Sequence, residues 1–333
     1  MATHETNLTE RVPRSNRAFS LEPREFSSYT SPVPVHLPSR SRFLNPEVVA
    51  KLKAIDLKAR LVVEGFLAGL HRSPYKGFSV EFAEHRAYMP GDELKRIDWR
   101  VYGRTDRFYV REYEEETNLR AYLLLDASGS MAYGEGRVTK LEYAGSLAAS
   151  LAYLLLRQKD SAGLVIFSDH IQHYIPPRSS PRHLNVLLSV LERLRPGGET
   201  DIASTLRQLA ERLKRRGLVI LLSDLWDEPA AVLEALRLFR ARKHEVLVFH
   251  ILDPNERTLS FRTPVVLRDL ETGQEKTIDP RIIRREYQDA FDDFARGLER
   301  GCAQGLVDYQ RIWTNTPYDQ ALFSYLARRQ RMQ

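Results

Sequence analysis

The chain has little of what disulfide-bonded, secreted and membrane proteins need. Its 333 residues include one cysteine, Cys302, so an intramolecular disulfide and a cysteine-built metal site are excluded. No apolar run reaches the roughly 18 residues that cross a bilayer. Residues 1–17 also have no apolar core of the kind that a secretory signal contains. We therefore expect a cytoplasmic, soluble protein with no membrane role.

The sequence also contains no run of five or more like charges and no phosphate-binding G-x-x-x-x-G-K-[ST] loop. The net charge of +6 comes from arginines spread along the chain, which makes nucleic-acid binding one alternative function. Its candidate surface is the mixture of arginine and aromatic residues at 96–113. Ten acidic residues between Glu81 and Glu116 argue against that function. The chain is predicted not to bind nucleic acid and not to be a P-loop ATPase.

The order of polar and apolar segments predicts four parts. Residues 1–42 are polar and hold five prolines, which predicts a disordered or loosely draped segment. Residues 43–118 predict a helix to about residue 67 and two strands, near 78–82 and 108–113. Strands and helices then alternate over 119–314, which is typical of an α/β fold with a doubly wound, mostly parallel sheet covered by helices on both faces. Residues 315–333 predict a closing helix.

A cluster of oxygen-bearing side chains is predicted at one edge of this sheet. The stretch LLLDASGSM at 123–131 places Asp126, Ser128 and Ser130 at the carboxyl end of a buried strand. Thr200 follows a glycine-rich loop, and Asp224 follows the strand at 218–222. Carboxyl ends of parallel strands meet at one edge, where open α/β sheets bind ligands. Carboxylate and hydroxyl oxygens suit Mg²⁺ or Mn²⁺, so a cation site is predicted.

Each of these residues also has an ordinary explanation as a loop or helix-start residue, and a catalytic explanation remains open. Ser128 or Ser130 could act as a nucleophile, or Asp126 could be phosphorylated, which would make the chain a hydrolase. However, a serine hydrolase of α/β type has G-x-S-x-G on a tight turn, and this segment is D-A-S-G-S. None of the nine histidines has a motif-like setting. We therefore predict that the chain is not an enzyme.

The motif Asp126-x-Ser128-x-Ser130, with Thr200 and Asp224 in this order, resembles the metal-ion-dependent adhesion site (MIDAS) of von Willebrand factor A (vWA) domains. The resemblance covers about residues 119–314. It implies a vWA-like fold, a bound Mg²⁺ (or Mn²⁺ or Ca²⁺), and a remaining coordination position taken by an acidic residue of another protein. One departure is Ser223-Asp224-Leu225, where the family commonly has Thr-Asp-Gly.

The segment before this unit is similar to the bacterial DUF58 family, over roughly residues 45–250. The matching residues are Arg86, Tyr88, Gly91, Asp92, Arg96, Asp98, Trp99 and Arg104. From the residues alone, this set is either a network of ion pairs around a buried Trp99 or a docking surface. The resemblance implies a MoxR-type AAA+ ATPase and a client protein with an acidic residue as partners. It also implies a role in assembly, activation or metal insertion of other protein complexes.

Overall fold

The computed structural model describes residues 19–20, 54–70, 85–87, 102–103, 106, 108–111, 119–134, 138–198, 200–270 and 273–330. Within these residues the main sheet has six strands in the order β11-β8-β7-β4-β5-β6. Their bounds are β4 (Arg120–Asp126), β5 (Ser161–Phe167), β6 (Ile171–Arg178), β7 (Leu218–Ser223), β8 (Glu245–Leu252) and β11 (Asp308–Trp313). All pairs are parallel except β5 with β6, which is antiparallel.

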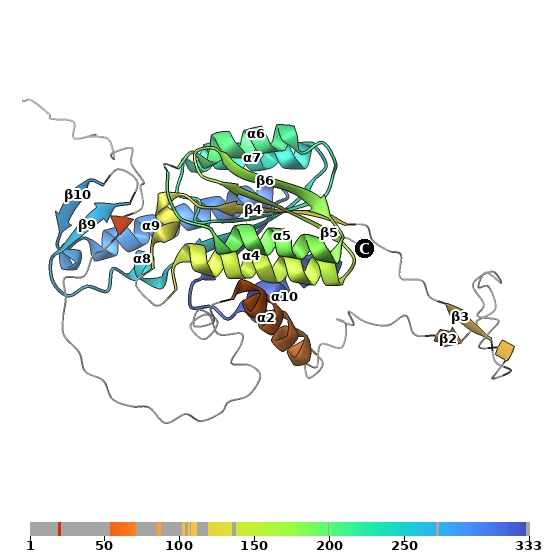
Figure 1. Cartoon of the computed structure of the whole chain (residues 1–333). Helices are drawn as coiled ribbons and strands as arrows, with labels where there is room; N and C mark the ends of the chain where they lie inside the picture. Colours follow the sequence, from red (N-terminus) through yellow and green to blue (C-terminus); the bar gives the residue numbers. More distant parts are fainter. Residues whose placement is uncertain are drawn as a thin grey trace, which may run out of the picture.

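Helices cover both faces of this sheet, as Figure 1 shows. One face packs against α4 (Lys140–Arg157) and α5 (Pro181–Glu192), and the other against α6 (Ile202–Arg212), α7 (Pro229–Ala241) and α9 (Pro280–Gln304). Strand β4 lies between the two cores: Leu123 and Leu125 join one, while Tyr122 and Leu124 join the other. Because alternate side chains of a strand point to opposite faces, only a continuous apolar run fits this position. The predicted α/β, doubly wound, mostly parallel fold is confirmed.

Two helices from either side of this unit pack on α4. They are α2 (Ile55–Leu70) and α10 (Tyr318–Gln330), which lie beneath α4 in Figure 1. Ile55, Ala59 and Val62 of α2 are buried in the same core as α4. The rings of Tyr143 on α4 and Tyr318 on α10 stack with centroids 4.6 Å apart. The α4 face of the core is therefore completed by segments outside the alternating region. The predicted boundaries between the four parts stay predictions.

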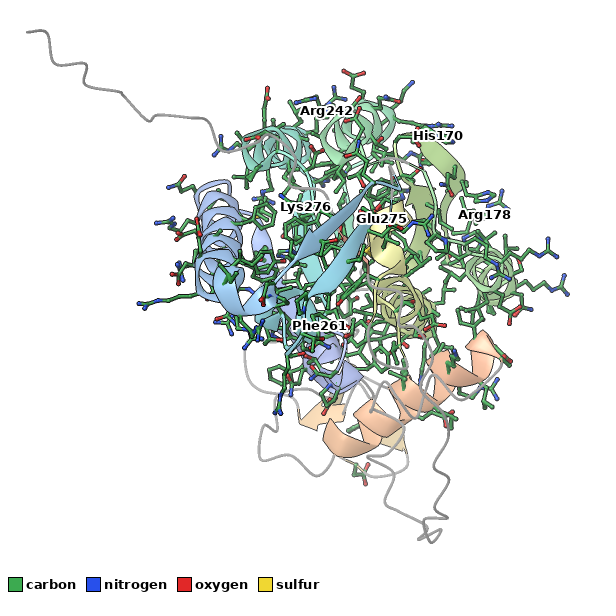
Figure 2. The ribbon with its side chains drawn as sticks, turned by 90° about the vertical axis from the view of Figure 1, so that its left-hand side faces the viewer. His170, Arg178, Arg242, Phe261, Glu275 and Lys276 are labelled. Carbon is green, nitrogen blue, oxygen red and sulfur yellow. The ribbon has the colours of Figure 1, made fainter. Side chains whose placement is uncertain are left out.

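Smaller elements flank the sheet. Strands β9 (Val265–Asp269) and β10 (Glu275–Ile278) form a hairpin, to which β1 (Phe19–Ser20) adds a third strand. Figure 2 shows this hairpin, with Glu275 and Lys276 labelled, in front of the sheet when it is viewed from the left of Figure 1. Strands β2 (His85–Ala87) and β3 (Tyr109–Arg111) pair antiparallel. Two short helices, η3 (Gly129–Ala132) and α8 (Pro254–Thr258), were not predicted from the sequence, because each spans too few residues to show a helical period.

Several expectations fall on residues that are not described. The predicted strand at 78–82 and most of the segment 1–42 lie outside the described residues. Of the predicted helix ending near residue 67, the structure describes the part from Ile55, and the helix continues to Leu70. In the described part of the chain, every helix is too short or too polar to cross a membrane.

Candidate metal centre

The predicted ligands lie where the strand order of the main sheet reverses. After β4 the chain adds β5 and β6 on one side, and then crosses to add β7, β8 and β11 on the other. The crevice outside the carboxyl ends of strands at such a switch point is the usual ligand site of this fold type. Asp126 is the last residue of β4, and Asp224 directly follows β7. Both carboxylates are fully buried.

The loop after β4 brings two hydroxyls together beside the first carboxylate. The backbone N–H of Ser128 donates to Asp126 Oδ1 at 2.9 Å, and the Ser128 and Ser130 Oγ atoms lie 3.0 Å apart. Both serines are fully buried. Adjacent ligands of an octahedral Mg²⁺ with bonds of 2.0–2.1 Å are separated by about 2.8–3.0 Å. The two hydroxyls are within hydrogen-bond distance of each other, and the same spacing also fits two ligands of one cation.

The glycine-rich loop before α6 is fastened to the loop after β4. Gly197 N–H donates to Ala127 O at 2.9 Å, and Gly129 N–H donates to Gly198 O at 3.2 Å. Gly198 has a φ of +85°, a conformation that favours glycine, and a Cβ there would make a tight contact of 3.0 Å with Ser168 Oγ. Thr200, two residues further on, is partly exposed, unlike the two serines. The structure thus brings the loop of Thr200 to the D-x-S-x-S loop.

Ser223 stands at the first position of the segment that departs from Thr-Asp-Gly. Its hydroxyl donates to Asp126 Oδ2 at 2.6 Å and accepts from the Leu225 N–H at 2.9 Å. Leu225 has a φ of 55°, a left-handed conformation that glycine adopts without strain. The position therefore has the backbone that favours glycine, and the fully buried Leu225 side chain offsets the strain by packing in the core.

A buried lysine that the sequence analysis missed completes the charge arrangement. Lys140, the first residue of α4, donates from Nζ to Asp224 Oδ2 at 2.6 Å and to Glu256 Oε1 at 2.5 Å. Lys140 is fully buried, and Glu256 on α8 is 8% exposed. A lysine at the positive end of a helix dipole is unfavourable unless carboxylates surround it. A lysine at the start of a predicted helix, ten residues after Ser130, was the feature of the sequence that could have indicated a buried ion pair.

Burial and charge shift the pKa values of these groups. Burial and the nearby Asp224 carboxylate raise the pKa of Asp126 to about 7, although hydrogen bonds from Ser223 and Ser128 act in the opposite direction. Burial alone would lower the pKa of Lys140, but the Asp224 and Glu256 carboxylates outweigh it and raise the pKa. A cation beside Asp126 and Asp224 would relieve the repulsion between the two carboxylates. The chemistry of the donor set, two carboxylates with neighbouring hydroxyls, thus suits a hard divalent cation.

Comparison with known proteins identifies the family. The model of the family described as "Protein of unknown function DUF58" matches residues 84–295, which is more than half of the chain. The chain belongs to the DUF58 family. Uncharacterized proteins of Mycobacterium tuberculosis and Mycobacterium bovis are similar to it, with 30% identity over 302 residues, or 85% of this chain and 92% of theirs.

Among solved structures, the DUF58 chain is similar to BatB from Bacteroides thetaiotaomicron, with a TM-score of 0.44 and 14% identity over 63% of this chain and 98% of that one. It is also similar to the SpRpn10 VWA domain, with a TM-score of 0.38 and 12% identity over 63% of this chain and 95% of that one. These values describe a resemblance in fold only.

His250 of this DUF58 protein contacts the backbone of a predicted ligand, Asp224. Its Nε2 lies 2.8 Å from the backbone oxygen of Asp224, and its Nδ1 lies 2.5 Å from the Tyr309 hydroxyl. Burial lowers the pKa of His250 to about 3, so the ring is neutral. A neutral ring with its proton on Nε2 donates to Asp224 O and accepts from Tyr309. His250 therefore fixes the backbone at Asp224.

Most of the residues that carry the resemblance to DUF58 lie outside the described part of the chain. Arg86 lies in β2, where the backbone is described. Tyr88, Gly91, Asp92, Arg96, Asp98, Trp99 and Arg104 lie outside the described residues. Whether they form a docking surface or a structural network stays a prediction. Among the described residues, no group of three or more His, Cys, Asp and Glu side chains could hold a metal. The candidate centre is instead of the mixed carboxylate and hydroxyl type.

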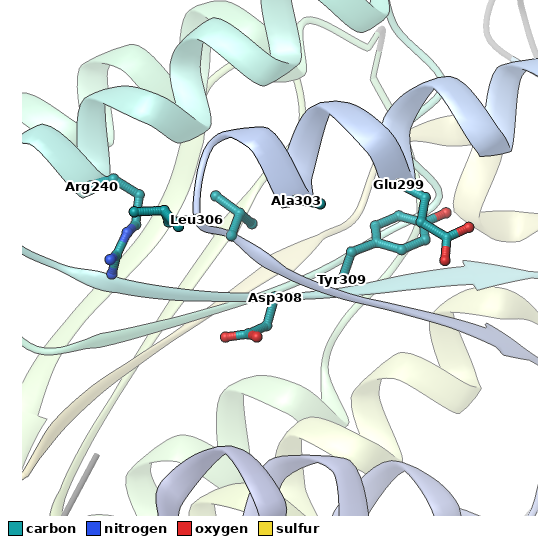
Figure 3. A pocket seen from close by; sticks show the side chains of 7 residues that line it. Arg240, Glu299, Ala303, Leu306, Asp308 and Tyr309 are labelled. Carbon is teal, nitrogen blue, oxygen red and sulfur yellow. The ribbon is translucent and has the colours of Figure 1, made fainter. Parts of the chain in front are cut away.

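A hollow of about 430 Å³ lies elsewhere, between α7, α9 and β11 (Figure 3). Arg240, Glu299 and Tyr309 are among the residues that line it. It adjoins Asp308, the first residue of β11, and therefore the amino ends of the parallel strands. The predicted ligands lie at the carboxyl ends, so this hollow is separate from the candidate centre.

Proposed function

We propose that this DUF58 protein is a metal-dependent protein-binding adaptor. Mg²⁺ or Mn²⁺ would be held by Asp126, Ser128, Ser130, Thr200 and Asp224. The observation that carries the proposal is the pair of buried serine hydroxyls, 3.0 Å apart, beside a buried carboxylate at the switch point of the sheet. When bound, the cation supplies a Lewis-acidic point that accepts a carboxylate oxygen from another protein.

The chain's own residues would position and shield this point. Ser223 and the Ser128 N–H each hold one oxygen of Asp126, and Lys140 holds one oxygen of Asp224. Thr200 is the partly exposed member of the set, so a partner's Asp or Glu would approach from its side. The β9–β10 hairpin, with the exposed Lys276, flanks the sheet in Figure 2 and offers a positive charge to an acidic partner.

The proposed partners are a MoxR-type AAA+ ATPase and a client protein with an acidic residue. This pairing is the expectation drawn from the motif resemblance in the sequence, and the sequence has no phosphate-binding G-x-x-x-x-G-K-[ST] loop of its own. Energy from ATP would therefore be supplied by the partner. The adaptor would act in assembly, activation or metal insertion of the client, and we assign it no catalytic role.

Titration calorimetry with Mg²⁺ and Mn²⁺ tests whether the protein binds a divalent cation at this site. It compares the wild type with the variants Asp126→Ala and Asp293→Ala. Asp293 is an exposed carboxylate on α9 that pairs with Arg296, so it serves as the matched control. We expect the wild type and Asp293→Ala to bind the cation, and Asp126→Ala to lose binding while keeping its far-UV circular dichroism. Equal binding by both variants would show that Asp126 is not a ligand and would contradict the proposed site.

A pull-down with the ATPase and candidate clients, with and without EDTA, tests the adaptor role. We expect capture of the client to require the divalent cation and to be lost in Asp126→Ala. Capture that is unchanged by EDTA would contradict the proposal. Esterase and phosphatase assays of the wild type and Ser128→Ala test the absence of a catalytic role, because turnover lost in Ser128→Ala would reveal a hydrolase.

A further inference from the structure

The oxygens of Asp224 are not equivalent. Oδ2 accepts a short 2.6 Å bond from Lys140 Nζ inside the protein, where neither side chain is exposed. Among the described residues, Oδ1 has one long contact, 3.4 Å from the Trp226 N–H. A carboxylate oxygen that is bound to a buried ammonium is not available to a second cation. Asp224 is therefore left with one oxygen for ligation.

Asp126 is restricted in a similar way. Its Oδ1 accepts from the Ser128 N–H at 2.9 Å, and its Oδ2 accepts from the Ser223 hydroxyl at 2.6 Å. These bonds fix the plane of the carboxylate and use one lone pair of each oxygen, which disfavours binding of both oxygens to one ion. Ca²⁺ takes 6–8 oxygens and often binds a carboxylate through both, whereas Mg²⁺ takes six ligands and keeps several waters. A site without a two-oxygen carboxylate ligand thus disfavours Ca²⁺.

The lysine is itself held in place by a second carboxylate. Glu256 accepts from Lys140 Nζ through Oε1 and from the Asp253 N–H through Oε2, so both of its oxygens are occupied. The positive charge of Lys140 and the negative charge of Glu256 cancel each other. The remaining two carboxylates, Asp126 and Asp224, match the charge of one divalent ion.

We infer that Lys140 is the specificity-determining residue of this centre. By holding Asp224 Oδ2, it makes the site prefer Mg²⁺ and Mn²⁺ to Ca²⁺. The inference rests on the proposed function, because it concerns the selectivity of the same site. It assigns a role in ion selection to a residue that is not among the predicted ligands.

The test compares two variants that differ only at position 140. Glu256→Gln keeps the hold of Lys140 on Asp224. The double variant Lys140→Met, Glu256→Gln removes that hold and keeps the net charge of the wild type, because one cation and one anion are lost together. Calorimetric titrations with MgCl₂ and CaCl₂ give the ratio of the two dissociation constants for each protein, and circular dichroism without metal checks the fold.

We expect the wild type and Glu256→Gln to prefer Mg²⁺, and the double variant to lose about tenfold of that preference, because removing a group that orients a metal ligand typically changes metal affinity by about 10–100-fold. An unchanged preference in the double variant would overturn the inference and leave the proposed function standing. A wild type that binds Ca²⁺ as tightly as Mg²⁺ would overturn it whatever the variants do. A wild type that binds no divalent cation would overturn both.

Discussion

Ser223→Ala is the sharpest test of how the candidate centre is stabilised. The hydroxyl makes two bonds in a fully buried position, to Asp126 Oδ2 and from the Leu225 N–H. A hydrogen bond to a charged group contributes roughly 1.5–3 kcal/mol, and a buried N–H without a partner costs about 1–3 kcal/mol. The bond to Leu225 also supports a left-handed residue, with φ of 55°. Allowing for partial relaxation, we expect the substitution to lower the free energy of unfolding by about 2–4 kcal/mol.

Urea unfolding followed by circular dichroism measures this loss, in metal-free buffer. Ser189→Ala is the matched control, because Ser189 is exposed and its hydroxyl donates to Val186 O within the same helix. We expect the control to change the free energy of unfolding by less than about 0.5 kcal/mol. Similar losses in the two variants, or a loss below about 1 kcal/mol in Ser223→Ala, would refute the reasoning that this hydroxyl satisfies two buried groups.

Three other predictions follow from features away from the centre. In α9, Gly301→Ala should destabilise the fold by about 1–2 kcal/mol, because its Cβ would meet the Leu233 side chain. A Cβ at Gly297 would have no neighbour within 4 Å, so Gly297→Ala should stabilise the helix by about 0.5–1 kcal/mol. Thermal unfolding compares the two variants, and equal shifts in melting temperature would contradict this account of the packing. Burial raises the pKa of the Cys302 thiol to about 12, so we expect no reaction with Ellman's reagent until the protein is unfolded in urea. Burial lowers the pKa of His183, so below about pH 6.5 the unfolded chain binds a proton at this residue that the folded chain resists. The contribution of His183 to stability should therefore fall from pH 7 to pH 5, and the free-energy difference between the wild type and His183→Gln, measured by urea unfolding at both pH values, should shift in favour of the variant at pH 5; an unchanged difference would contradict this.

Part of this fold could be predicted because its signals are local. The apolar runs that became β4, β7 and β8 are long enough to be recognised, and helices lie between them, so a doubly wound sheet follows. The placement of Asp126 and Asp224 at one edge then follows from the parallel order of the strands alone. The structure places both residues at that edge, while their metal binding stays a prediction.

The remaining contacts of the centre depend on tertiary structure that no local pattern encodes. Lys140 meets Glu256 across 116 positions of sequence, and Glu256 lies on a helix of five residues. Ser223 was noted as a departure from a motif, but its bond to Asp126 joins residues 97 positions apart. Such pairs become visible only when the loops at the ends of several strands are placed together. For the same reason, the sequence predicted the carboxylates and hydroxyls of the site but not the buried positive charge of Lys140 beside them.

The arrangement of α2, α4 and α10 has a consequence for how this protein is made. Helix α4 is synthesised early, yet one side of its core is covered partly by Tyr318 and Tyr325 of α10, which follow nearly two hundred residues later. During translation at about 5–20 residues per second, that apolar surface stays incompletely covered for roughly ten seconds or more. A nascent chain of this kind exposes a hydrophobic patch to chaperones and to other nascent chains throughout that interval. Helix α10 then covers the part of the core that α2 and α4 leave exposed.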